Sequence, residues 1–292
     1  MRLALNVDQA DSAAPGLGSS RLAALPGLCC QAAGGEEDWA DDLTLAWLLY
    51  YAAAQLLDGV QDNDEPEAWW MGQGASVALS AFSGLYFSAS LALNAVSQHP
   101  ATRAHGSEIT EDFYRTFLVM GSGQHADLTR SSLTLEQYWQ QAETKSGVFF
   151  SLACRAGARL ATNESVTIRE YAQYGQNLGM LIQITDDLED VFPPQRTGTH
   201  GQRSQFARSL PVVYALEVFP PHQAERLRMC LQAAPHDVEA AQEAVSLVDQ
   251  SNAATYVMIE IERYKQEALK ALERANPQPP AGDALAKIIQ EI

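Results

Sequence analysis

Residues 174–192 read YGQNLGMLIQITDDLEDVF, an apolar run that ends in closely spaced acidic residues. The apolar part predicts a helix packed among its neighbours, and the acidic part predicts the end of that helix. Asp186 and Asp190 stand four residues apart, so both carboxylates project from one helical face, where like charges repel each other. Ile182 and Ile184 crowd this end of the helix with apolar side chains, which disfavours a simply solvated surface. Because the like charges repel each other, we expect a positively charged group to bind between them.

A second acidic cluster follows the apolar segment AWLLYYAAAQLL at residues 46–57, where Asp58 and Asp62 repeat the spacing of four. Carboxylates suit Mg²⁺, which readily shares its coordination shell with phosphates. Two such faces opposed across a helical bundle predict Mg²⁺ ions on a diphosphate, where they would neutralise the leaving group and promote C–O ionisation. The alternative, for either cluster, is an acidic helix end that is simply solvated.

The distribution of proline predicts the fold class. No proline lies between Pro100 and Pro193, and this stretch is rich in Ala, Leu, Gln and Glu without alternation of period two. Proline disrupts a helix interior, so its absence favours one helix after another. No repeat, linker or change of composition marks a second domain. We therefore predict a single all-α domain over residues 1–292, with residues 1–15 as a flexible N-terminal segment.

The net charge excludes several classes of function. Lys and Arg number 19 against 36 Asp and Glu, which gives a formal charge of −17. A surface this acidic repels nucleic acid and anionic lipid. A phosphate-bearing substrate would need local neutralisation, for which a metal ion is the obvious means.

Cysteine usage and hydropathy bear on location. The four cysteines have no CxxC or zinc-ligand spacing, and no apolar segment typical of a signal peptide begins the chain, so we expect a cytoplasmic protein. Residues 71–102 carry no Asp, Glu, Lys or Arg, but Gly74, Gly84 and several serines weaken their hydrophobicity. We expect a helix packed closely on all sides or lining a cavity, and no membrane span.

These motifs together resemble those of the trans-prenyl diphosphate synthases, which form the polyprenyl synthetase family of the class I isoprenoid synthases. Residues 174–192 resemble the second aspartate-rich motif of that family. Four further landmarks follow in the family's order within about residues 16–216: Arg21, the QxxD segment 124–127, Lys145-Ser-Gly and Arg208-Ser-Leu-Pro. The resemblance implies a helical bundle around a central cavity, an allylic prenyl diphosphate substrate, up to three Mg²⁺ ions and a homodimer.

The resemblance also implies a role for each site residue. The Mg²⁺ ligands would be Asp58, Asp62, Asp186 and Asp190, with Asp187 as a ligand or a support behind the ligands. Lys145 would contact the diphosphate, and Arg208, with Arg196 or Arg203, would close over it. Arg21 would bind isopentenyl diphosphate, while Gln124, Asp127 and Gln183 would shape the site.

The prenyl tail needs an apolar tunnel. Ala54 and Tyr51 lie on the same helical face as Asp58, one and two turns before it. The small Ala54 leaves room, and Tyr51 with Trp47 would form a floor deeper down. Equally, these are ordinary core residues.

Several positions depart from the family pattern, and most of these departures remove positive charge. Gly59 stands where the family has its second Asp, the arginine pair is absent from residues 64–71, and the N-terminal lysine is missing from GLGSSR at 16–21. In the family, the arginine pair and the N-terminal lysine hold the second, homoallylic diphosphate during chain elongation. Without them, a second highly charged anion would bind poorly to so acidic a protein.

The segments QDNDEPEAWWM at 61–71 and GQHADLT at 123–129 are similar to the ComQ group of this family. That group transfers a prenyl chain to a tryptophan of a peptide, an acceptor without a diphosphate. We therefore expect a Mg²⁺-dependent prenyltransferase whose acceptor is isopentenyl diphosphate or a Trp-containing peptide. A terpene cyclase and a non-catalytic homologue that binds prenyl diphosphate are the alternatives.

Overall fold

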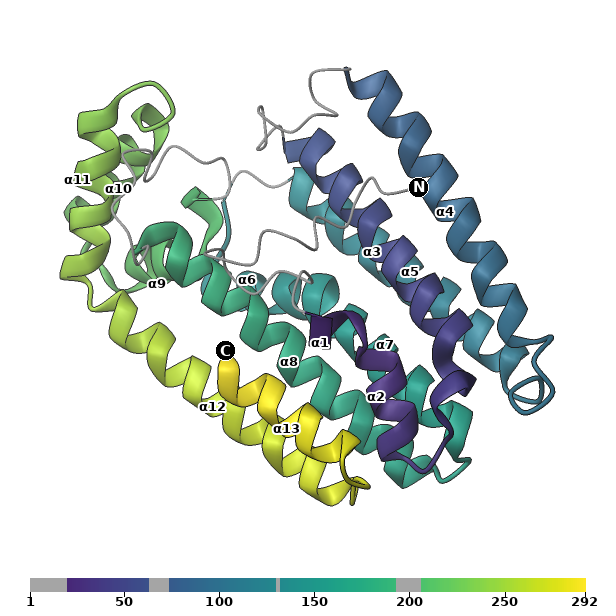
Figure 1. Cartoon of the computed structure of the whole chain (residues 1–292). Helices are drawn as coiled ribbons and strands as arrows, with labels where there is room; N and C mark the ends of the chain where they lie inside the picture. Colours follow the sequence, from purple (N-terminus) through teal and green to yellow (C-terminus); the bar gives the residue numbers. More distant parts are fainter. Residues whose placement is uncertain (1–19, 63–73, 130–131, 193–205) are drawn as a thin grey trace.

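The computed structural model describes residues 20–62, 74–129, 132–192 and 206–292, and all regular structure in these ranges is helical, as Figure 1 shows. The predicted all-α class is confirmed. The first half of the chain forms α1 (Ser20–Ala23), α2 (Leu25–Ala32), η1 (Glu37–Ala40), α3 (Asp41–Asp62), α4 (Ala75–Val96), α5 (Gly106–Thr129), α6 (Leu135–Ala142) and η3 (Glu143–Gly147). The second half forms α7 (Val148–Ala161), α8 (Ser165–Val191), η4 (Phe206–Arg208), α9 (Leu210–Val218), α10 (Pro221–Ala233), α11 (Val238–Gln250), α12 (Ala253–Arg274) and α13 (Ala281–Glu291). The predicted flexible segment, residues 1–15, lies outside the described residues.

Helix α8 is the element around which the others are arranged. It spans 27 residues and packs on α7, α12 and η3. Two glycines let neighbouring backbones approach it closely: a Cβ at Gly175 would lie 2.4 Å from the Phe150 carbonyl oxygen of α7, and one at Gly179 would lie 2.4 Å from the Ser146 carbonyl oxygen. The sequence of α8 therefore sets how near α7 and η3 can lie.

The main core lies between α2, α3, α7 and α8. Its largest fully buried side chains include Trp47, Tyr50, Tyr171 and Tyr174. The four cysteines are buried and form no disulfide with one another. Burial of these rings together with the aliphatic side chains around them stabilises the fold.

Polar contacts tie α5 to α7 beside this core. The Arg155 guanidinium donates to both carboxylate oxygens of Asp112, at 2.7 and 2.8 Å, and to the Thr116 hydroxyl at 2.7 Å. Arg159 forms a second ion pair with Glu108 across the same two helices. Because the Arg155 pair is largely shielded from water, its bidentate geometry fixes the position of α5 more firmly than a surface pair would.

Helix α4 corrects one expectation. We predicted that residues 71–102 would be packed on all sides or line a cavity, but α4 buries only Ala78, Ala89, Leu93 and Val96. Its main neighbour is α3, and its other face is open to solvent, with Phe87 68% and Leu91 73% exposed. The prediction took the absence of charged residues as a sign of burial, whereas in this chain the uncharged helix α4 forms an apolar outer surface.

Two helical segments, Glu37–Gln61 and Ala75–Val96, are long and apolar enough to cross a bilayer by length and composition. The first is a helix of the main core, since Leu43, Ala46 and Trp47 on it are fully buried. The absence of a membrane span stays a prediction.

The close packing of α2 on α7 can be tested at a glycine. A Cβ at Gly157 would lie 2.2 Å from the Pro26 carbonyl oxygen, so Gly157→Ala must separate the two helices. We expect it to lower the free energy of unfolding by about 1–3 kcal/mol in urea titrations. The control is Gly27→Ala on α2, where the new methyl group would meet only Thr44 at 3.8 Å. It should leave stability unchanged or raise it by up to about 1 kcal/mol, and equal destabilisation by both variants would contradict this account.

Candidate active site

A buried carboxylate lies near the end of α8. Asp187 is 7% exposed and accepts three hydrogen bonds. The Tyr138 hydroxyl of α6 donates to Oδ2 at 2.7 Å, the backbone N–H of Leu210 donates to Oδ2 at 2.6 Å, and the Gln183 amide donates to Oδ1 at 2.9 Å. Burial raises the pKa of Asp187 to about 6, and the three donors oppose that rise. This geometry favours the supporting role for Asp187 over direct metal ligation.

Lys145 lies on η3, a π turn within one continuous helix that runs from α6 into α7. Its Nζ is 3.1 Å from Oδ2 of Asp58 on α3. The next residue, Ser146, donates its hydroxyl proton to the Gln183 side chain of α8 at 2.7 Å. The π turn therefore joins the helices that carry the two acidic clusters, and such local bulges are frequent at functional sites.

Asp186 differs from its neighbour Asp187. Its side chain is half-buried, but its Oδ1 atom is shielded from solvent and has no hydrogen-bond donor. Burial, with the nearby charges of Asp187, Glu189 and Asp190, raises the pKa of Asp186 to about 7. A buried carboxylate oxygen that lacks a donor is costly in an empty site and well suited to a cation.

The residues present fit a hard divalent cation in part. Asp186 has a carboxylate oxygen available, and Asp190 lies half-buried one turn further along α8. Asp58 is held by Lys145 instead. Within the described ranges, no three Asp, Glu, His or Cys side chains already converge on one point. The side chain of Asp62 lies outside the described residues, as do Arg196 and Arg203.

The end of α3 is tied to the end of α5. The Gln124 amide donates to the Gln61 side-chain oxygen at 3.0 Å, three residues beyond Asp58. The predicted site residue Gln124 thus lies next to the first acidic cluster. The side chain of Asp127, predicted with it, lies outside the described residues.

Arg21 and Arg208 are the two remaining predicted cationic residues within the described ranges. Arg21 forms an ion pair with Glu291 on α13, which holds the N-terminal helix α1 against the C-terminal one. Arg208 lies half-buried on η4, two residues before the Leu210 N–H that binds Asp187. The contact of either arginine with a substrate stays a prediction.

Aromatic side chains fill the space along α3 before Asp58. Tyr51 is half-buried beside Phe149 of α7, with ring centroids 5.9 Å apart, and Phe149 stacks on the fully buried Trp47 at 5.1 Å. Ala54 lies one turn nearer to Asp58 and is itself half-buried. The tunnel and its floor stay a prediction, and in the structure Trp47, Tyr51 and Phe149 pack in the main core.

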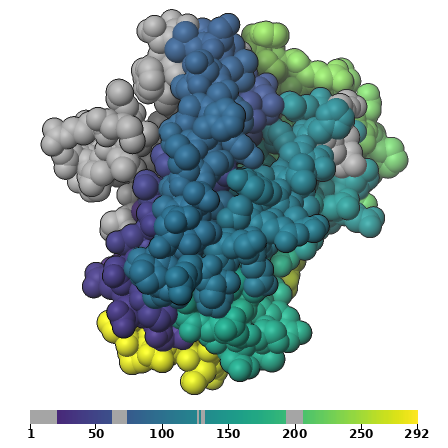
Figure 2. Space-filling view, turned by 90° about the vertical axis from the view of Figure 1, so that its right-hand side faces the viewer, coloured from purple at the N-terminus to yellow at the C-terminus, as the bar shows by residue number. Residues whose placement is uncertain are grey.

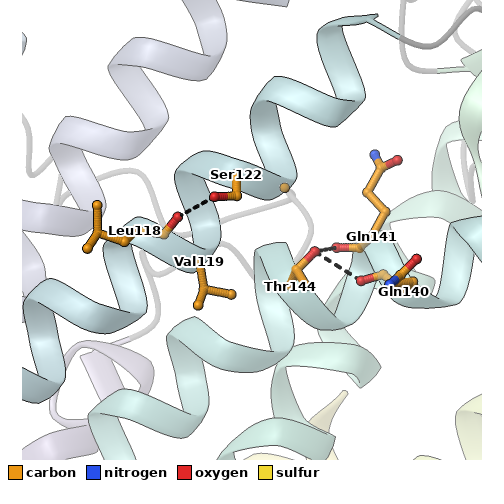
Figure 3. A pocket seen from close by; sticks show the side chains of 7 residues that line it. Leu118, Val119, Ser122, Gln140, Gln141 and Thr144 are labelled. Atoms are coloured by element: carbon orange, nitrogen blue, oxygen red, sulfur yellow. Dashed lines mark hydrogen bonds between the residues drawn. The ribbon is translucent and has the colours of Figure 1, made fainter.

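A pocket of about 400 Å³ lies on the α5 side of the π turn. Figure 3 shows Leu118, Val119 and Ser122 of α5 on one side of it and Gln140, Gln141 and Thr144 on the other. The described residues that line it include none of those predicted to bind substrate. It borders the candidate site only through Gly123 and Thr144, the neighbours of Gln124 and Lys145.

Three residues of this arrangement were missed by sequence reasoning: Tyr138, Ser146 and Gln61. Ser146 follows Lys145 directly in the motif that was noted, but a serine there carries no signal of its own. Tyr138 follows the capping box of Thr134 and Gln137 at the start of α6, which positions the helix without marking the tyrosine.

With this geometry established, comparison with known proteins identifies the class. The model of the polyprenyl synthetase family matches residues 24–248, and the chain belongs to that family. The predicted resemblance is confirmed.

Relatives named as prenyltransferases and prenyl diphosphate synthases agree with this assignment. The tryptophan prenyltransferase ComQ of Bacillus subtilis subsp. natto is 30% identical over 162 residues, which are 55% of this chain and 48% of that protein. The matched region thus spans about half of that relative. ComQ of Bacillus subtilis strain 168 is 24% identical over 250 residues, covering 83% of this chain and 78% of the relative.

Solved structures show the same fold. A geranylgeranyl pyrophosphate synthetase from Pyrococcus horikoshii superposes with a TM-score of 0.79 at 20% identity, covering 94% of this chain and 85% of that one. A polyprenyl synthase from Caulobacter crescentus, complexed with calcium and isoprenyl diphosphate, superposes with a TM-score of 0.78 at 21% identity, with the same coverage.

The raised pKa of Asp186 predicts a pH dependence of stability. A carboxyl whose folded pKa is raised from 3.8 to about 7 binds more protons when folded than when unfolded, so its cost to stability builds up as pH rises from 3.8 to about 7 and is complete above that. In metal-free buffer, Asp186→Asn should therefore be more stable than the wild type at pH 8 by more than about 1 kcal/mol. The advantage should shrink at pH 5. Thermal denaturation at both pH values measures this, and an advantage independent of pH would contradict the assignment.

Proposed function

We propose that this protein is a Mg²⁺-dependent prenyltransferase that ionises an allylic prenyl diphosphate and transfers the prenyl group to an acceptor. The observation that carries the proposal is the position of Lys145, beside Asp58 on α3 and adjacent in sequence to Ser146, which binds α8. A lysine so placed lies between the two acidic clusters, where a diphosphate bound by both would need a cation.

The chain's own residues account for most of the reaction. Asp186 and Asp190 on one helix and Asp58 on another would hold Mg²⁺, which when bound neutralises the leaving diphosphate. Lys145 would exchange its pair with Asp58 for a diphosphate oxygen. The C–O bond then breaks with its electron pair going to the diphosphate, and the aromatic side chains along α3 exclude water from the allylic cation. The acceptor's π electrons form the new C–C bond, and the acceptor loses a proton.

The charge pattern supports an acceptor without a diphosphate. The sequence lacks the arginine pair and the N-terminal lysine that would help Arg21 to hold a second diphosphate, and two relatives are named as tryptophan prenyltransferases. We therefore favour a Trp-containing peptide over isopentenyl diphosphate as the acceptor. A cyclase reaction, which needs no second diphosphate site either, is the second candidate.

We further propose that the protein acts in the cytoplasm as a homodimer. Figure 2 shows α4 and α5 side by side on one face of the molecule. This face exposes apolar side chains from both helices: Val77, Leu79, Phe87, Leu91, Tyr114, Leu118 and Val119. Because α4 carries no charged residue, it is also where two copies of a protein with charge −17 repel each other least.

The reaction is tested by pyrophosphate release with Mg²⁺ and geranyl, farnesyl or geranylgeranyl diphosphate. Each substrate is supplied alone, with isopentenyl diphosphate, and with a Trp-containing peptide. We expect release that requires the peptide. Lys145→Met should reduce the rate by about 100-fold or more, as removal of a charge-stabilising donor does. The matched control is Lys270→Met, an exposed lysine paired with Glu267 at 2.9 Å on α12, which should retain full activity.

The other outcomes separate the alternatives. Release that requires isopentenyl diphosphate would mean chain elongation and would refute the argument from the missing cations. Release with no acceptor would point to a cyclase. Binding of prenyl diphosphate without release in any mixture would identify a non-catalytic homologue. Undiminished turnover by Asp186→Ala would refute the mechanism with two acidic clusters.

The proposed dimer face is tested by introducing charge. In a symmetric dimer, Leu118→Glu on α5 places a like charge on both copies at the apolar face. Size-exclusion chromatography with light scattering should show a dimer for the wild type and a monomer for this variant. The control is Met229→Glu on α10, a residue of similar exposure that should stay dimeric. A monomeric wild type would refute the dimer, and a dimeric Leu118→Glu variant would place the interface elsewhere.

A further inference from the structure

A chain of hydrogen bonds runs through the candidate site from α6 to the π turn. The Tyr138 hydroxyl donates to Asp187 at 2.7 Å, the Gln183 amide donates to Asp187 at 2.9 Å, and the Ser146 hydroxyl donates to the Gln183 oxygen at 2.7 Å. Every donor points along the chain toward the Asp187 carboxylate. Hydrogen bonds aligned in this way polarise and strengthen one another inside a protein.

Two members of this chain are next to residues that act in the proposed reaction. Asp187 adjoins Asp186, whose Oδ1 atom is buried without a donor, and Ser146 adjoins Lys145, which lies 3.1 Å from Asp58. Fixing Asp187 therefore fixes the end of α8, whose backbone carries Asp186. Fixing Ser146 fixes the backbone of the turn that carries Lys145.

From this geometry we infer that Tyr138 and Ser146 are positioning residues, which hold the Asp186 carboxylate and the Lys145 ammonium at a set separation for a metal-bound diphosphate. The inference rests on the proposed function, because it names the diphosphate as the group for which the separation is set. Each hydroxyl acts through a carboxylate or an amide that in turn holds a residue of the site.

A tyrosine hydroxyl is not needed at this position for packing. Tyr138 is buried against Met180, Ile184 and Leu210, apolar side chains that a phenylalanine ring would contact equally well. The hydroxyl group adds only its bond to Asp187. Removing it leaves Oδ2 of that carboxylate with the Leu210 N–H as its remaining donor, so the side chain loses a restraint in the direction of α6.

The structure provides a matched control for a buried tyrosine hydroxyl. Tyr174 also lies in the core and donates from its hydroxyl to the Leu285 carbonyl oxygen at 2.9 Å, which ties α8 to α13. It stands more than three helical turns from Asp187 on the same helix. Tyr174→Phe thus removes a bond of the same kind from α8 without touching the site.

The test compares the wild type with Tyr138→Phe, Ser146→Ala, their double variant and Tyr174→Phe. Calorimetry measures binding of inorganic pyrophosphate in the presence of Mg²⁺, and thermal denaturation measures folding. We expect each of the two site variants to weaken pyrophosphate binding by about tenfold, as loss of a group that orients metal ligands does. The double variant should lose less than the product of the two effects, since both act on one chain. Tyr174→Phe should lose thermal stability and keep wild-type binding.

Several results would overturn the inference. Tyr138→Phe and Ser146→Ala variants that bind pyrophosphate as the wild type does would show that the chain only stabilises the fold. Equal weakening by Tyr174→Phe would show the same. A wild type that binds pyrophosphate with Mg²⁺ but releases none from any prenyl diphosphate would refute the proposed reaction, while the comparison of variants would still decide the positioning role. A wild type that binds no pyrophosphate would refute both.

Discussion

The arrangement of the site depends on one buried carboxylate, that of Asp187. Placing a charge in the core is costly unless donors surround it, and here three donors from three different parts of the chain meet the two oxygens. The Leu210 N–H is also the first of α9, so the carboxylate lies at the positive end of that helix. A single side chain thereby fixes α6, α9 and the end of α8 relative to one another.

A second constraint is electrostatic. The protein is strongly acidic, and its two acidic clusters lie on helices that the fold brings to either side of the π turn. Lys145 neutralises the nearer one, whereas Asp186 is left half-buried with a raised pKa. The two clusters thus differ before any ligand arrives: one carboxylate is already paired with a cation, and the other holds a proton more readily than a normal aspartate does. A bound metal would displace both the lysine and the proton.

Much of this could be predicted from the sequence, for identifiable reasons. The spacing of Asp186 and Asp190 and the absence of proline over a long stretch are local properties, and both led to the helical fold. The different roles of Asp186 and Asp187 could not be predicted, because adjacent residues on a helix face different neighbours and those neighbours come from α6 and α9. The exposure of α4 was missed for a similar reason: an uncharged segment such as the one around Phe87 looks the same in sequence whether a core or an outer face requires it.

The π turn has a consequence for how this site can change over time. Residues Glu143–Gly147 interrupt an otherwise continuous α-helix with a wider π-helical turn. This turn contains one residue more than a regular α-helical turn would. Loss of one residue there would restore the regular spiral, and the turn's own side chains, Lys145 among them, would then point in other directions. The direction in which Lys145 points is therefore determined by the number of residues in the turn as well as by their identity. A change of length in this turn would therefore redirect Lys145 even if every remaining side chain were kept.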